Sequence, residues 1–433
     1  MLKRNAFFGF AGFVVPALTI LATYPILASR LGAEAFGIFV LASSIGGAIS
    51  FIDLGISAAT VKYLAEDIER QKTDSAAEII STSLLFYGVV GITVGLVVWL
   101  AAPWLAGLFA AETGLAEEAV WAFRLAGVQF AAFFLLNVIL SLFKGMLEFH
   151  WSAVYLSLLT ILTYVGAVAA VLIGGAGLIG VVIVSVVSHW ASLLLAAGTA
   201  FQRCRHFRMN VLSAKPSMAA FRRMIRFGAY MAVNSVSGLF LYQIQRFLVG
   251  ALFGPAAVTV FHLSVTFVSK VHSVIGAITE VLFPFSSAER NIHRVRYIYL
   301  RMLSGSAVLA AVALGILVIW AEPILTLWIG EELSRDVTPL VPYFAAAYFV
   351  LALSAAPYHL VNGTGKPWVN TLSYAGNALL NVLFIAVFLY FDQSLKSFAL
   401  AFVMANIVNG LLYQAAVECW LWRRKLLVAA PTP

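Results

Sequence analysis

The stretch IISTSLLFYGVVGITVGLVVWLAAPW, residues 79–104, decides the fold class of this chain. It contains no charged side chain, and about 20 residues of helix are enough to cross the ~30 Å hydrocarbon layer of a membrane. Similar apolar runs recur along all 433 residues. The pattern predicts an all-α polytopic membrane protein with twelve transmembrane helices. The predicted spans are residues 6–29, 36–59, 79–104, 119–143, 151–173, 178–201, 227–251, 256–283, 297–321, 337–360, 367–391 and 395–421.

The composition excludes several other classes. The chain is 62% hydrophobic and 11% charged, whereas soluble domains are roughly 45–50% apolar and about 25% charged. Two cysteines exclude a disulfide scaffold. Outer-membrane strands would alternate over segments of ~10 residues, and these runs are continuous.

The basic residues predict the orientation of the spans. With the N-terminus placed in the cytoplasm, 21 of the 27 Lys and Arg residues fall on the cytoplasmic side and 3 on the other. This excess follows the positive-inside rule. We therefore expect both termini in the cytoplasm. The net charge of +8 then reflects topology and contact with anionic membrane lipids, and no nucleic-acid partner is expected.

A polar stretch divides the chain into two sets of six spans. We expect an N-terminal lobe over 1–201, a basic cytoplasmic linker over 202–226 and a C-terminal lobe over 227–433. Two pairs of short segments occupy equivalent places in the two halves. LGAEAFGIF at 31–39 matches FGPAAVTVF at 253–261, and KGMLE at 144–148 matches NGTGK at 362–366. Because six spans return the chain to the same side, the repeat would be parallel, with the substrate site at its interface.

Several motifs resemble, in their order, those of a known family. They are RLGAEAFG at 30–37, FIDLG at 51–55, FPFS at 283–286, LTLWIG at 325–330 and NGTGK at 362–366. The chain resembles the O-antigen and exopolysaccharide flippases of the multidrug/oligosaccharidyl-lipid/polysaccharide (MOP) superfamily. This resemblance implies two six-helix lobes around a central cavity and transport by alternating access. It also implies a multi-pass protein of the bacterial inner membrane.

The resemblance implies a function as well. Such a carrier moves undecaprenyl-diphosphate-linked oligosaccharide outward, with membrane lipids, a polysaccharide polymerase and the chain-length machinery as its partners. One departure concerns Gln245, which stands before Arg246 where the family often has Asp. An ion pair or a proton-coupling role taken from that acid is therefore in doubt, and coupling to H⁺ or Na⁺ stays open.

Polar side chains inside the spans supply candidates for the substrate cavity. Inserting an ionised side chain at the bilayer centre costs at least ~2.5–3.5 kcal/mol, so each such residue is expected to have a structural or functional role. Lys270 lies near the centre of span 8. Arginines near span ends could instead extend to the interface, and Arg124 could pair with Glu117. The candidates are Lys270, Arg246, Arg30, Arg124, Gln245, Tyr242, Asn377 and Asn381.

The two asparagines have an alternative role. The amides of Asn377 and Asn381 suit sugar hydroxyls, and they suit hydrogen bonds between helices equally well.

The gating or ion-coupling candidates are Asp53, Glu280 and His262. Asp53 ends a small-polar stripe that includes Ser43 and Ser57, and it could also act as a cap.

Basic residues near the inner mouth are candidates for receiving the diphosphate. They are Arg4, Lys62, Lys144, Arg226 and Arg290. Ordinary positive-inside anchoring is the alternative for each of them.

No enzyme signature, cofactor motif or metal-ligand spacing is present, so we expect a protein that is not an enzyme. Three alternatives to the glycan flippase stay open. They are a cation-coupled multidrug exporter, a flippase of lipid-linked peptidoglycan precursor and a non-transporting scaffold.

Overall fold

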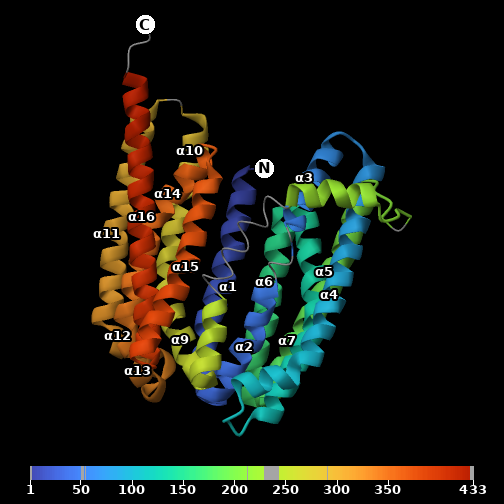
Figure 1. Cartoon of the computed structure of the whole chain (residues 1–433). Coiled ribbons are helices and arrows are strands. Elements are labelled where there is room, and N and C mark those ends of the chain that lie inside the picture. The colour runs from blue at the N-terminus through green and yellow to red at the C-terminus, as the bar shows by residue number, and fades with distance from the viewer. Residues whose placement is uncertain are drawn as a thin grey trace. The chain divides into compact units, whose positions relative to one another are not determined.

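The computed structural model describes residues 2–49, 53, 55–211, 213–228, 243–289 and 291–429. In these ranges every regular element is a helix (Figure 1). The first helices are α1 (Leu2–Leu31), α2 (Ala33–Ile49), α3 (Ile56–Glu69), α4 (Thr73–Phe109), α5 (Ala116–Gly145), α6 (Phe149–Gly174) and α7 (Leu178–His206). After residue 243 follow α9 (Ile244–Thr279), α10 (Leu282–Ala288), α11 (Ile292–Ile319), α12 (Ala321–Ile329), α13 (Glu331–Val337), the 3₁₀ turn η2 (Thr338–Leu340), α14 (Val341–Gly363), α15 (Pro367–Phe391) and α16 (Leu395–Ala429).

The described helices confirm the predicted class of all-α membrane protein. Ten of them are long and apolar enough to cross a membrane, and Ala33–Gly47 is a shorter apolar helix. The predicted span 227–251 lies partly outside the described residues. The count of twelve therefore stays a prediction.

The contacts between residues divide the chain into two units. Unit 1 is Met1–Thr259 and unit 2 is Val260–Pro433. The division falls inside α9, five residues after Gly254, where a φ of 78° interrupts the helix. The predicted lobe boundaries stay a prediction.

The second predicted span is interrupted. The prediction of one helix over 36–59 was wrong, because α2 ends at Ile49 and α3 begins at Ile56. Gly55 precedes α3 with a φ of 70°, in the left-handed region that glycine adopts without steric cost. An Asp53 carboxylate oxygen accepts hydrogen bonds from the Ser57 amide at 3.2 Å and the Ser57 hydroxyl at 2.8 Å. Asp53 thus caps the first turn of α3.

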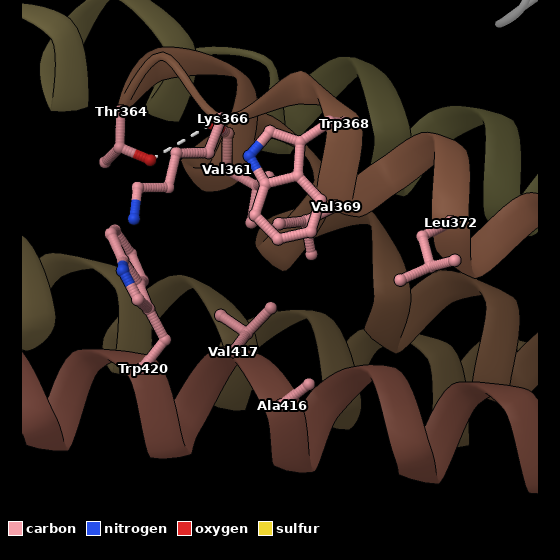
Figure 2. A pocket seen from close by; sticks show the side chains of 9 residues that line it. All are labelled: Val361, Thr364, Lys366, Trp368, Val369, Leu372, Ala416, Val417 and Trp420. Carbon is pink, nitrogen blue, oxygen red and sulfur yellow. Dashed lines mark hydrogen bonds between the residues drawn. The ribbon is translucent and has the colours of Figure 1, made fainter.

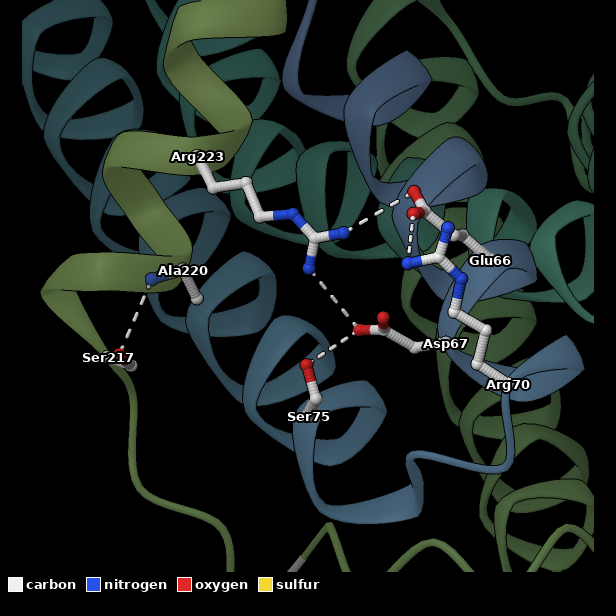
Figure 3. Close-up of polar contacts among 7 residues, drawn as sticks. All are labelled: Glu66, Asp67, Arg70, Ser75, Ser217, Ala220 and Arg223. Atoms are coloured by element: carbon white, nitrogen blue, oxygen red, sulfur yellow. Dashed lines mark hydrogen bonds and ion pairs between the residues drawn. The ribbon is translucent and has the colours of Figure 1, made fainter.

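The second half of the predicted linker is a packed part of unit 1. Residues 218–228 form a helix, and its Met224 is fully buried. Arg223 lies 3.4 Å from a carboxylate oxygen of Glu66 and 3.5 Å from one of Asp67, both on α3 (Figure 3). Asp67 also accepts a hydrogen bond from Ser75 of α4 at 2.7 Å. This network joins the segment to α3 and α4.

The same turn joins α5 to α6 in unit 1 and α14 to α15 in unit 2. In the first turn the Met146 amide donates to the Leu142 carbonyl, Leu147 to Lys144, and Glu148 to Phe143. In the second turn the Thr364 amide donates to the Leu360 carbonyl, Gly365 to Asn362, and Lys366 to Val361. Both are Schellman-type helix ends. Leu147 and Gly365 occupy the left-handed position, with φ of 60° and 76°. The two segments that the sequence paired as a repeat therefore form equivalent turns.

Candidate functional site

Helix α2 and residues 244–253 of α9 pack closely and antiparallel within unit 1. A Cβ atom on Gly37 would overlap the backbone of Pro255, and one on Gly47 would overlap the side chain of Gln243. Between these two contacts, Ser44 receives a hydrogen bond from Arg246. Small residues let membrane helices approach at such positions. The close approach holds the polar side chain of Arg246 against α2.

Arg246 is the centre of a polar cluster. Its Nη1 donates to the Ser44 hydroxyl at 3.2 Å and to the Gln243 side-chain oxygen at 3.1 Å. The rings of Tyr24 in α1 and Tyr164 in α6 meet edge to face with their centres 5.5 Å apart, and both phenols lie within electrostatic reach of Arg246. We call these five residues the Arg246 cluster.

The cluster combines one permanent positive charge with hydroxyl and amide groups. The helices α1, α6 and α9 that supply most of it are all long enough to span a membrane. An ionisable side chain inside such a bundle is a functional candidate by default. The guanidinium has five fixed donors and no acceptor, so it can bind phosphate or carboxylate oxygens in pairs. No cluster member carries a carboxylate.

Two further arginine candidates lie outside the cluster. Arg30 is exposed in the last turn of α1. The Arg124 guanidinium carbon lies 5.1 Å from the ring centre of Trp121 and 5.6 Å from that of Trp99. No ion pair between Arg124 and Glu117 is recorded among the described residues. Cation–π contact with two tryptophans therefore replaces the pairing that the sequence suggested.

Lys270 lies in unit 2, half-buried on α9. No ion pair involving it occurs among the described residues. His262, two turns earlier on the same helix, is buried. Glu280 is exposed just after α9, within electrostatic reach of His359 on α14. These observations place Lys270 on a polar face of α9 without assigning it a contact.

Two asparagines of α15, Asn370 and Asn377, form hydrogen bonds with neighbouring helices. Asn377 donates to Asn406 of α16 at 3.1 Å, and Asn381 donates to Asn377 at 3.0 Å. Asn370 donates to Asn362 of α14 at 2.9 Å. A cavity of about 40 Å³ lies between α14, α15 and α16 beside these amides, with room for water. For Asn377 the structure shows a hydrogen bond between helices, whereas Asn381 donates to Asn377 within α15.

The basic candidates for the inner mouth are only partly described. The Lys62 ammonium lies 4.2 Å from the ring centre of Phe227. Phe227 follows Arg226 in the helix formed by residues 218–228. Lys144 is exposed in the last turn of α5. Arg290 and the cavity candidate Tyr242 lie outside the described residues, and the side chain of Arg4 is not described. Gln245, beside Arg246, is buried.

Four members of the Arg246 cluster were not among the candidates predicted from the sequence. They are Tyr24, Ser44, Tyr164 and Gln243. The stripe assigned to span 2 used Ser43, which is exposed, whereas the neighbouring Ser44 is buried and bonds Arg246. The spacing of Gly37 and Gly47 was the available signal, because it marks the close face of α2 on which Ser44 lies.

Comparison with known proteins identifies the family. Residues 2–289 match the family model described as polysaccharide biosynthesis protein. The chain is 20% identical to the "Putative O-antigen transporter" of Shigella flexneri over 433 residues, covering 97% of each protein. It is 22% identical over 349 residues to the "Uncharacterized membrane protein EpsK" of Bacillus subtilis (strain 168), covering 77% of this chain and 66% of that protein.

Solved structures show the same fold at low identity. An inward-facing multidrug resistance MATE family transporter of the MOP superfamily matches with a TM-score of 0.84 and 16% identity, covering 98% of this chain and 99% of the other. A MOP superfamily transporter from Pyrococcus furiosus, described as having a binding pocket of reverse polarity, matches with a TM-score of 0.68 and 17% identity, covering 98% of this chain and 96% of the other. The chain therefore belongs to the polysaccharide biosynthesis protein family, whose model matches two thirds of its length.

Proposed function

We propose that this transporter flips an undecaprenyl-diphosphate-linked oligosaccharide from the cytoplasmic to the outer face of the bacterial inner membrane. The O-antigen, capsule and exopolysaccharide repeat units are the substrate class. The observation that carries the proposal is the Arg246 cluster. It presents a cation with hydroxyl and amide groups inside membrane-spanning helices.

The chemistry of the cluster suits this substrate. A lipid-linked oligosaccharide has an anionic diphosphate, often acidic sugars, and many hydroxyl groups. A guanidinium binds such anionic oxygens through paired, charge-assisted hydrogen bonds. Tyrosine, serine and glutamine side chains both donate to and accept from sugar hydroxyls. A cationic drug would instead require carboxylates at this place.

Lys270, a half-buried cation of unit 2, is proposed to act on the same substrate during transport. Coupling to H⁺ or Na⁺, both termini in the cytoplasm, and assembly with a polymerase and chain-length machinery belong to the same proposal. Transport then requires that inward- and outward-facing states both be populated.

The proposal is tested with purified protein in proteoliposomes that contain fluorescent undecaprenyl-diphosphate oligosaccharide. A glycosidase added outside reaches only the outer leaflet. We expect protein-dependent cleavage beyond the half of the label that is already outside. No such cleavage with several glycans, together with dye efflux driven by a proton or sodium gradient, would contradict the proposal in favour of a drug exporter.

A further inference from the structure

An apolar groove lies between the end of α14, the start of α15 and residues 416–420 of α16 in unit 2 (Figure 2). Its volume is about 240 Å³. Val361 and Val369 line it on one side and Val417 on the other, and Trp368 and Leu372, which also line it, are 62% and 65% exposed (Figure 2). Lys366 and Trp420 stand together at one end, with the ammonium 5.1 Å from the indole ring centre. The groove is thus open to its surroundings along an apolar side and bounded by a cation.

Unit 1 has the equivalent place filled. The shared turn aligns Phe143 with Val361, because each carbonyl accepts the same amide of the turn. The donors of those bonds, Glu148 and Lys366, are equivalent for the same reason. Trp151 is equivalent to Val369, because the Trp151 amide donates to the Glu148 carbonyl and the Val369 amide donates to the Lys366 carbonyl. In unit 1, Phe143 is fully buried and stacks near Trp151 and Tyr155. Two valines in unit 2 leave open the space that two aromatic rings occupy in unit 1.

The charges at the two equivalent places also differ. Glu148 forms an ion pair with Arg203 of α7, with a second contact of 2.8 Å from Nε. Lys366 carries the opposite charge to Glu148, and it makes no ion pair among the described residues. Further along α16 the chain continues with the basic run Arg423, Arg424 and Lys425. Among the described residues, Lys366 therefore gives one end of the groove an unpaired positive charge, whereas Glu148 at the equivalent place is paired.

We propose that this groove holds one acyl chain of an acidic phospholipid, with the lipid phosphate bound to Lys366. The Lys and Arg bias predicts that this end of the helices lies at the cytoplasmic leaflet, where acidic lipids attract basic side chains. Tryptophans such as Trp368 and Trp420 favour the headgroup level of a membrane. The apolar walls match the acyl chain, and the ammonium matches the phosphate. A lipid at this place would cover the open side between α15 and α16.

The proposal does not depend on the transported substrate. A neutral phospholipid would fill the apolar walls without using Lys366. A polyprenyl diphosphate would use both, and it would then be the true occupant. The experiment separates these outcomes because each lipid is added alone and in competition.

Native mass spectrometry of the purified full chain in detergent counts the retained lipids. Added phosphatidylglycerol is compared with phosphatidylcholine and with undecaprenyl diphosphate. We expect one phosphatidylglycerol to be retained in preference to phosphatidylcholine. Lys366→Gln should weaken that retention roughly fivefold, the effect of one basic residue near an acidic membrane surface. The matched variant Lys396→Gln, at the start of α16, should retain the lipid as the parent does.

A second variant tests the shape of the groove. Val361→Phe with Val369→Trp introduces the aromatic residues of unit 1, and we expect it to abolish the preferred site while the protein stays folded by circular dichroism. If this variant does not fold, Lys366→Gln alone decides. Equal retention in Lys366→Gln and the parent, equal binding of phosphatidylcholine, or displacement of phosphatidylglycerol by an equimolar amount of undecaprenyl diphosphate would each overturn the proposal.

Discussion

Arg246 shows how a single buried cation acquires a defined environment. Its guanidinium donates hydrogen bonds to two neutral oxygens, from Ser44 and Gln243. These neutral acceptors orient the guanidinium without cancelling its positive charge, so its field can act on an anionic ligand. Gln245, the preceding residue, adds an amide and no negative charge.

The neighbouring serines of α2 offer a matched test at this scale. Ser44→Ala removes an acceptor of Arg246, and we expect the flipping rate to fall several-fold, since a neutral hydrogen bond is worth about 0.5–1.5 kcal/mol. Ser43→Ala changes the adjacent, exposed hydroxyl and should leave the rate unchanged. The measurement is the initial rate of glycosidase accessibility in proteoliposomes. Equal rates in both variants would show that Ser44 does not position Arg246.

At the scale of elements, glycines fix where helices meet. The approach of α2 to α9 depends on Gly37, where any Cβ would overlap the backbone of Pro255. Gly145 and Gly363 serve the two equivalent turns, because a Cβ there would press on Leu64 of α3 and Ser286 of α10. The sequence identified these glycines as parts of paired motifs. It could not show which helix each one faces, because that depends on packing between segments far apart in the chain.

Substitution of Gly37 should therefore be costly. Gly37→Val inserts a branched side chain where no space exists, and we expect a loss of at least about 1–3 kcal/mol of stability. Gly107→Val is the matched control, because a Cβ at Gly107 meets no atom within 4 Å. Thermal unfolding in detergent, followed by tryptophan fluorescence, gives both values. A midpoint in Gly37→Val equal to that of Gly107→Val would contradict the close packing of α2 on α9.

The segment helix over 218–228 offers a second test of packing. Asp67 is 2% exposed and bonds both Ser75 and Arg223 (Figure 3). Asp67→Asn removes its charge, and we expect about 1–3 kcal/mol of weaker docking, the cost of an impaired buried hydrogen bond. Limited trypsin cleavage at Arg222 and Arg223 should then become faster. Asp74→Asn, a nearby helix-start acid, is the control, and equal cleavage of both variants would rule out the anchoring role of Asp67.

At the scale of the whole molecule, composition and charge predicted the class and the family motifs predicted the relatives. The continuous apolar runs need only length and hydrophobicity, which the sequence states directly. The sequence did not predict the break at Gly55 or the packed end of the linker, because each depends on a particular contact. These contacts are Asp53 with Ser57, and Arg223 with α3. The Arg246 cluster escaped in part because its members come from four separate helices.

The predicted orientation can be tested with the two native cysteines. Cys204 is buried and Cys419 is exposed, and both lie on the side assigned to the cytoplasm. A membrane-impermeant maleimide should label Cys419 in inside-out vesicles but not in intact spheroplasts. Cys419→Ser provides the control, since it should abolish the labelling. Labelling of Cys419 in intact spheroplasts would place the C-terminus outside and contradict the orientation.

The central claim is that this chain flips a lipid-linked oligosaccharide by means of the Arg246 cluster. The most direct measurement compares the parent, Arg246→Gln and Arg335→Gln in the proteoliposome glycosidase assay. Arg335 pairs with Glu331 on the surface of α13, so its variant makes the same chemical change elsewhere. We predict exposure of the inner-leaflet glycan by the parent and by Arg335→Gln, and a rate at least roughly tenfold lower in Arg246→Gln, because hydrogen bonds to charged groups contribute about 1.5–3 kcal/mol. Equal rates in all three folded proteins would contradict the account.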